Sequence, residues 1–208
     1  AGLDITTGNE NTVVGSRALG TATTATWNVA IGGDAMFGVP SGQAVSGVVA
    51  VGLEALKGGS NTTTAINNTV AIGNASLKNL STGQYNTAIG FEALSTATEL
   101  DKNTAIGYQA LKVASGSAGY TGNTAVGYQA GVAVTTAITN TLIGASSGLA
   151  LTTGGQNVII GASAGSTSTA AYQMVIIGKS AGSGGNITAA ALGSIAIGVA
   201  ALNQLTSG

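Results

Sequence analysis

The chain has few side chains that could act as catalysts. Among its 208 residues there is no histidine and no cysteine, so the usual pairs of a nucleophile and a base cannot form. Two carboxylates stand out, because Asp34 and Glu54 each follow a recurring glycine by two residues. In adjacent turns of a coiled chain they would lie about 5 Å apart, which is the separation of the carboxyl pair in a retaining glycosidase.

The residues at the same repeat position in other copies argue against catalysis. The same place in other copies of the repeat holds basic, acidic and amide side chains, namely Arg17, Glu92, Gln109 and Gln129. Such a mixture is typical of a solvated edge. The remaining carboxylates, which form no carboxylate-rich loop of the kind that calcium requires, are Asp4, Glu10, Glu99 and Asp101. We therefore predict a protein that is not an enzyme, with no catalytic residue, no cofactor site and no metal site.

The recurring glycine belongs to a phrase that runs through the whole chain. It reads "NTAIGFEAL" from Asn86, "NTAIGYQAL" from Asn103 and "NTAVGYQAG" from Asn123. The eleven copies are aligned on Gly15, Gly32, Gly52, Gly73, Gly90, Gly107, Gly127, Gly144, Gly161, Gly178 and Gly198. These glycines are 17, 20 or 21 residues apart. A fixed period of this length indicates one structural unit that is stacked many times.

The residues before the glycine predict a β-strand. The position directly before it is Val or Ile in all eleven copies, and β-branched side chains favour strands. The position two before it is Ala in seven copies. Neighbouring strand positions point to opposite faces, so both faces of this strand are apolar. We predict that one face is the inside of the coil and that the alanine face packs closely against a partner.

The residues after the glycine predict the return of the chain. The third residue after the glycine is Ala or Ser in every copy. The fourth residue is Leu or Met in seven copies and Gly in four. We interpret this step as a second short strand or a tight turn, with the repeat glycine at the corner. A coil of 17 residues would then hold two short strands and two turns. The sequence predicts an all-β, parallel β-solenoid or β-roll of about eleven coils, roughly 50 Å long. A helical solenoid is disfavoured, because no 3.6-residue stripe of large apolar residues occurs.

Two polar columns and four insertions complete the pattern. Asn stands four before the glycine in seven copies, and it could form a ladder along the rod or cap a turn. These residues are Asn11, Asn28, Asn86, Asn103, Asn123, Asn140 and Asn157. A broken column of Thr stands three before the glycine, at Thr12, Thr87, Thr104, Thr124 and Thr141. A flat Thr array could bind ice, but Val or Ile fills this position in the other six copies.

Four copies of the repeat carry insertions. Three or four extra residues follow Gly32, Gly52, Gly107 and Gly178, and we expect them in loops on one side of the solenoid.

Composition excludes several classes of partner. Only 6% of the residues are charged and the formal net charge is −1, so no basic patch for nucleic acid is expected. No apolar run approaches the roughly 20 residues of a membrane-spanning helix. The repeat makes residues 1–208 a single solenoid domain. Because the first and last residues fall in mid-repeat, we predict a segment of a longer fibre that could also stack end to end.

The phrase "NTAIGYQAL…TG…NTAVGYQAG" resembles the repeats of bacteriophage tail-fibre and tailspike-like proteins. It is more distantly similar to the heads of trimeric autotransporter adhesins, whose shorter units read "AIG…A.G". The resemblance covers nearly the whole chain and is strongest over residues 86–165. It implies a parallel β-roll or β-helix, usually a homotrimer, that serves as a shaft or receptor-binding region.

The sequence therefore predicts a structural and adhesive fibre component that attaches to a host surface. Its expected location is a virion or the outside of a cell, and its expected partners are further copies of itself and a surface receptor or glycan. A bacterial cell-surface adhesin or extracellular filament subunit is the alternative that the same physics allows. A polysaccharide-degrading tailspike is a more remote one, since it would need Asp34 and Glu54 as catalysts.

Overall fold

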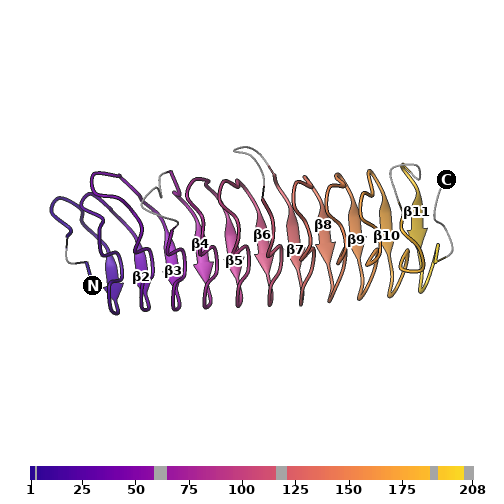
Figure 1. The fold of residues 1–208 in the computed structure, drawn as a ribbon, viewed down its shortest axis with the longest axis horizontal. Helices are drawn as coiled ribbons and strands as arrows, with labels where there is room; N and C mark the ends of the chain where they lie inside the picture. Colours follow the sequence, from indigo (N-terminus) through magenta and orange to yellow (C-terminus); the bar gives the residue numbers. More distant parts are fainter. Residues whose placement is uncertain (3, 59–64, 116–120, 188–191, 204–208) are drawn as a thin grey trace.

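The protein is a rod of stacked coils with one short strand in each coil (Figure 1). The computed structural model describes residues 1–2, 4–58, 65–115, 121–187 and 192–203. The strands are β1 (Thr12–Val14), β2 (Val29–Ile31), β3 (Val49–Val51), β4 (Val70–Ile72), β5 (Thr87–Ile89), β6 (Thr104–Ile106), β7 (Thr124–Val126), β8 (Thr141–Ile143), β9 (Val158–Ile160), β10 (Val175–Ile177) and β11 (Ile195–Ile197). They form one parallel sheet in sequence order, and each coil is numbered by its strand. The predicted parallel β-solenoid is confirmed.

The register of the sheet follows the repeat. Ala88 of β5 pairs with Ala105 of β6, and Ala105 pairs with Ala125 of β7. The second step spans 20 residues and not 17, so the extra residues lie outside the sheet and leave the pairing unchanged. The described loop of residues 37–47, between β2 and β3, rises on the side away from the strand tips (Figure 1). The other three insertions contain residues 59–64, 116–120 and 188–191, which lie outside the described residues.

The step after each repeat glycine is a turn and not a second strand. Its residues form consecutive turns, and bridges outside the named strands occur only singly in the described residues. The physical reason is that two positions in this step have positive φ. Glu92 and Leu94 in coil 5, for example, have φ of 53° and 52°. A strand requires negative φ throughout. Of the two interpretations of this step the tight turn is therefore confirmed, and the count of two strands in each coil was wrong.

The interior of the rod is thin and lined by small side chains. The middle residue of each strand, mostly Ala, points inward and is buried in every strand except β1. The Ala or Ser three after the glycine is also buried in coils 1 to 10, and the Leu or Met that follows it in coils 1 to 6 fills the remaining space. The Leu side chains that are fully buried in this way are Leu19, Leu56, Leu77, Leu94 and Leu111.

This burial corrects one prediction from the sequence. The alanine face of the strand is the inside of the coil and not the face that awaits a partner. The Val and Ile side chains directly before the glycines point outward instead, and Val14 and Ile197 are 57% and 67% exposed. The reason is how the coil is filled: in coils 2 to 6 the buried Leu or Met of the returning turn occupies the interior, so the strand contributes only the methyl group of Ala.

The Asn column forms a ladder along the rod, in one run from Asn11 to Asn28 and a second from Asn86 to Asn157. Within each run the Oδ1 atom of one Asn accepts from the backbone N–H of the next at 3.0 Å. The Nδ2 group donates to the previous Oδ1 atom at 2.8–3.5 Å. Nδ2 also donates to turn carbonyls, such as the Leu100 carbonyl from Asn86. The side chains therefore act both as a ladder and as turn caps, which are the two roles that the sequence suggested.

Candidate functional site

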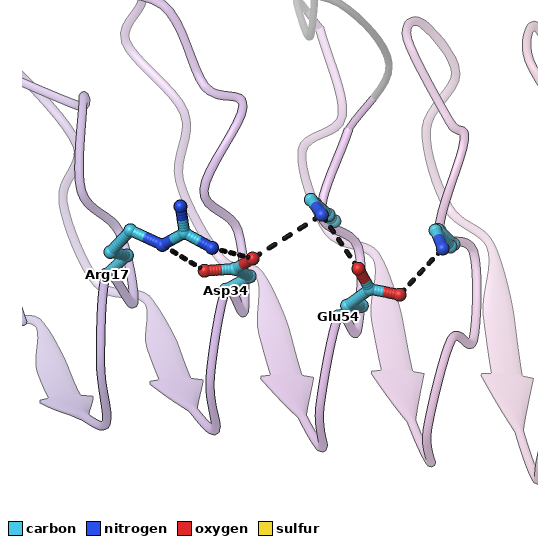
Figure 2. Close-up of polar contacts among 5 residues, drawn as sticks. Arg17, Asp34 and Glu54 are labelled. Carbon is cyan, nitrogen blue, oxygen red and sulfur yellow. Dashed lines mark hydrogen bonds and ion pairs between the residues drawn. The ribbon is translucent and has the colours of Figure 1, made fainter.

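The two candidate carboxylates belong to a chain of ion pairs that joins successive coils (Figure 2). The guanidinium of Arg17 donates to both oxygens of Asp34, at 2.7 Å and 2.6 Å. The Nζ atom of Lys57 lies 3.4 Å from Asp34 and 2.7 Å from Glu54, so one ammonium bridges the two carboxylates. Lys78 completes the network at 2.6 Å from the other oxygen of Glu54.

The electrostatics of Glu54 fit ion pairing. Hydrogen bonds from Lys57 and then Lys78 lower its pKa to about 2. Asp34 is buried, and both of its oxygens lie against cations. A general acid must keep its proton near neutral pH, whereas this environment keeps Glu54 ionised. The geometry brings the two candidate carboxylates to one shared lysine, Lys57, and it favours a role in linking coils 1 to 4.

Acidification should therefore weaken the rod. A depressed carboxyl pKa contributes stability that is present above the ordinary value near 4.5 and is lost as the pH falls toward 2. The pKa of Glu92 is also lowered, first by Lys112 and then by Gln109. We expect the melting temperature, followed by circular dichroism, to fall between about pH 5 and about pH 2. The Glu54→Gln variant should show a shallower fall, because the amide does not titrate.

Gln is a suitable replacement at this position, since Gln109 and Gln129 occupy it in other coils with φ of 54° and 51°. Lys78→Met should flatten the same part of the curve by removing one partner of Glu54. If Glu54→Gln keeps the pH dependence of the parent chain, the ion pairs do not contribute to stability.

The described residues hold no cluster of metal-ligating side chains. Within them, no three or more His, Cys, Asp or Glu side chains gather where they could hold a metal ion. The same stretches of chain contain no helix that is long and apolar enough to cross a bilayer.

The outward face of the sheet is the most unusual surface of the molecule. Each of the eleven strands contributes two outward side chains, its first and its third. All of them are Val, Ile or Thr, and none is charged. We call the first positions the outer T/V column and the third positions the outer V/I column. Because parallel strands are about 4.8 Å apart, both columns have a regular spacing along the whole rod.

The size of this face is compatible with a contact surface. Two columns about 50 Å long and about 10 Å wide cover roughly 500 Å². The largest apolar patch on a typical soluble monomer covers about 300–600 Å² and is often functional. Side chains on the face are half-buried by their neighbours in the middle strands and more exposed near the ends, as at Ile195 and Ile197.

Hydroxyl groups interrupt the apolar surface in one block. The outer T/V column holds Thr12 in coil 1 and then Thr87, Thr104, Thr124 and Thr141 in four consecutive coils. No side-chain hydrogen bond is made by these hydroxyls within the described part of the chain. They are therefore free to pair with groups outside the chain.

Aromatic side chains flank the same coils. Phe91, Tyr108 and Tyr128 directly follow the repeat glycines of coils 5, 6 and 7 and form a continuous stack. Their ring centroids are 5.5 Å and 5.2 Å apart, and the rings are nearly parallel. All three side chains are exposed. An exposed tyrosine of this kind suits the rim of an interface, where its ring is covered and its hydroxyl stays in water.

Sequence reasoning missed this face because it assigned the alanine column to the outside. The signal was present: every strand begins with Thr, Val or Ile, a β-branched residue at each of eleven positions. Comparison of the chain with family models, with curated proteins and with solved structures gave no match.

Proposed function

We propose that the chain is a structural and adhesive fibre component, of the kind that forms part of a phage tail fibre or a similar appendage and attaches it to a host surface. The observation that carries the proposal is the long, charge-free outward face on a straight rod (Figure 1). A rod of similar coils transmits force through its backbone hydrogen bonds. Catalysis would need matched acid and base groups, which the ion-paired state of Asp34 and Glu54 disfavours.

The proposed fibre contains several copies of the chain packed through the outward face. Two such faces in contact bury about 1,000 Å², which is the lower limit for a specific interface. A surface with a spacing of about 4.8 Å matches another surface of the same period best, and this favours a copy of the same chain as partner. Three copies is the number that the resemblance to tail-fibre repeats implies.

Light scattering on the purified chain tests the self-association. We expect a mass that is a multiple of the 19.8 kDa of one chain. Ile106→Lys places a charge on the outer V/I column and should shift the mass toward one chain, because the lysine would be buried in the interface. Thr98→Lys is the matched control, since Thr98 is exposed outside the sheet, and it should leave the mass unchanged. A single-chain mass for the parent protein at all concentrations would contradict the proposal.

Immunogold labelling tests where the fibre acts. An antibody against the chain should mark fibres on virions. Labelling of appendages on the cell surface would instead identify a cellular adhesin or filament subunit, which the same rod can build. Labelling confined to the cell interior would contradict both.

A further inference from the structure

We infer that the block of threonines in coils 5 to 8 sets the register in which copies of this chain pack, with the copies parallel and the outer T/V column nearest the axis between them. The inference deepens the proposed function and rests on it. The partner that occupies the outward face is a second copy of this chain.

The apolar part of the face cannot set a register by itself. The Val and Ile side chains repeat at every coil, so a partner displaced by one coil meets almost the same surface. Coiled coils have the same problem, and a polar residue at one buried position resolves it by making the wrong registers unfavourable. The Thr block is the corresponding irregularity here, because four consecutive hydroxyls interrupt a column that is otherwise Val or Ile over most of its length.

Hydrogen bonding selects the column that lies at the axis. A buried hydroxyl without a partner is costly, and the outer V/I column offers no polar side chain at any coil. Only the outer T/V column of another copy can supply partners at the same height. Packing about this column also leaves the stack of Phe91, Tyr108 and Tyr128 at the rim, where the two tyrosine hydroxyls remain solvated.

The sequence of the column then favours the parallel, unshifted arrangement. In that arrangement every Thr meets Thr and every Val meets Val. A shift of one coil buries hydroxyls against methyl groups, because it opposes Thr12 to Val29, Thr87 to Val70 and Thr141 to Val158. An antiparallel pair that keeps the four-Thr block matched is displaced by one coil and leaves the first coil of each copy uncovered. Copies that lie at equal heights around an axis parallel to the rod form a closed assembly. Copies that are shifted along this axis form an open, staggered one.

Disulfide trapping tests the register. Because the chain contains no cysteine, the introduced thiols are the only ones that can form a disulfide. Val49→Cys and Val70→Cys place single thiols on the outer T/V column of adjacent coils. A disulfide needs Cα atoms within about 7 Å. When the two variants are mixed and oxidised, mass spectrometry of the linked peptides should find like pairs, Val49→Cys with itself and Val70→Cys with itself. Their excess over unlike pairs should be about tenfold or more, the ratio that corresponds to about 1.4 kcal/mol.

The Thr block is then removed in the same background. The replacement of Thr87, Thr104, Thr124 and Thr141 by Val keeps the shape of each side chain and deletes the hydroxyl. Unlike pairs should become comparable in amount with like pairs. Ile89→Val, Ile106→Val and Ile143→Val on the outer V/I column of the same block form the control, and they should keep the excess of like pairs.

The outcomes separate the two proposals. Frequent unlike pairs in the parent background, or an unchanged excess after removal of the hydroxyls, would overturn the register inference and leave self-association standing. A link from a Val158→Cys chain to either of the two thiol variants, without like pairs, would show antiparallel packing and overturn it as well. A single-chain mass with no disulfide at all would overturn the proposed self-association itself.

Discussion

Replacement of Gly107 by alanine is expected to destabilise the rod strongly. Its φ is +133°, and a Cβ atom built on it would lie 2.7 Å from the carbonyl carbon of Gly127 in the next coil and closer still to the oxygen of that carbonyl. The neighbour is backbone and is held by the hydrogen bond from the Gly127 amide to the Ile106 carbonyl at 2.8 Å. Neither side can therefore move without breaking the stack between coils 6 and 7.

Two costs add at this position. Backbone strain at such a φ costs about 1–3 kcal/mol for a residue with a side chain. The contact with the next coil costs about 1–3 kcal/mol more, as for other forced overpacking. Because each coil contacts mainly its neighbours, the damage should be local. Hydrogen exchange of the β6 and β7 amides should accelerate strongly, and the melting temperature should fall by roughly 10 °C.

Two other glycines separate these costs. Gly198 has nearly the same φ, +126°, but a Cβ atom there meets nothing within 4 Å among the described residues. Gly42 lies in the loop between β2 and β3, has φ of +82° and is equally unobstructed by the described part of the chain. Gly198→Ala and Gly42→Ala should show only the cost of strain. If Gly107→Ala melts at the same temperature as these two controls, the close approach of stacked glycines is not what excludes a side chain.

The glycine column also explains why the register was predictable from the sequence. At ten stacked positions a Cβ atom would collide with the backbone of the next coil. Gly is therefore required at each of these positions, and its recurrence can be recognised in the sequence despite the insertions. Ala105 pairs with Ala125 across a link of 20 residues, and Ile176 pairs with Ala196 across another. Close backbone contact is thus the feature that the sequence records most directly.

The orientation of the strand was not predictable in the same way. An alternation of period two assigns residues to opposite faces, but it does not say which face is inside. The usual rule places the larger side chain inside, and it fails here because the Leu or Met of the returning turn already fills the interior of the coil. Ala88 is buried within the coil while Ile89 lies on the surface. The candidate surface was consequently missed, although its β-branched residues were all visible.

The left-handed residues in the turn after the glycine were not predicted, for a different reason. Leu rarely adopts positive φ, so a column rich in Leu does not suggest a left-handed residue. Leu94 and Leu111 nevertheless have φ of 52° and 49°. Burial of the whole side chain offsets the strain. The sequence did carry one signal, since Gly takes the place of Leu at Gly131, Gly148, Gly165 and Gly182.

That exchange of Leu for Gly predicts the second large effect, a compensating pair in the core. In coils 2 to 6 the alanine of the strand is combined with Leu or Met after the turn, as Ala105 is with Leu111. In coils 8 to 10 the sizes are reversed, as Ile159 faces Gly165, with Ile159 Cδ1 3.2 Å from a Cβ atom built on that glycine. One large side chain fills each of these levels, from one wall of the coil or from the other.

Coil 7 lies at the boundary between the two arrangements and has Ala125 and Gly131. Leu142 of coil 8 covers both coils, because its Cδ1 is 2.5 Å from a Cβ atom built on Gly131 and its Cδ2 is 3.0 Å from one built on Gly148. Leu142→Ala should empty this space and cost about 2–5 kcal/mol. Gly131→Leu should clash with Leu142 and cost about 1–3 kcal/mol.

The double variant Gly131→Leu, Leu142→Ala should recover most of the stability that each single change loses. It moves the boundary by one coil, so that coil 7 acquires the Ala–Leu pair of coil 6 and coil 8 becomes the new junction. The backbone already permits it, since Gly131 has φ of 58° and Leu111 has 49° at the equivalent position. Denaturant unfolding of the four proteins would give a coupling free energy of about 2–3 kcal/mol in favour of the pair. If the losses in free energy of unfolding of the two single variants simply added, the two walls of the coil would pack independently. The account in which one large side chain fills each level of the interior would then be wrong.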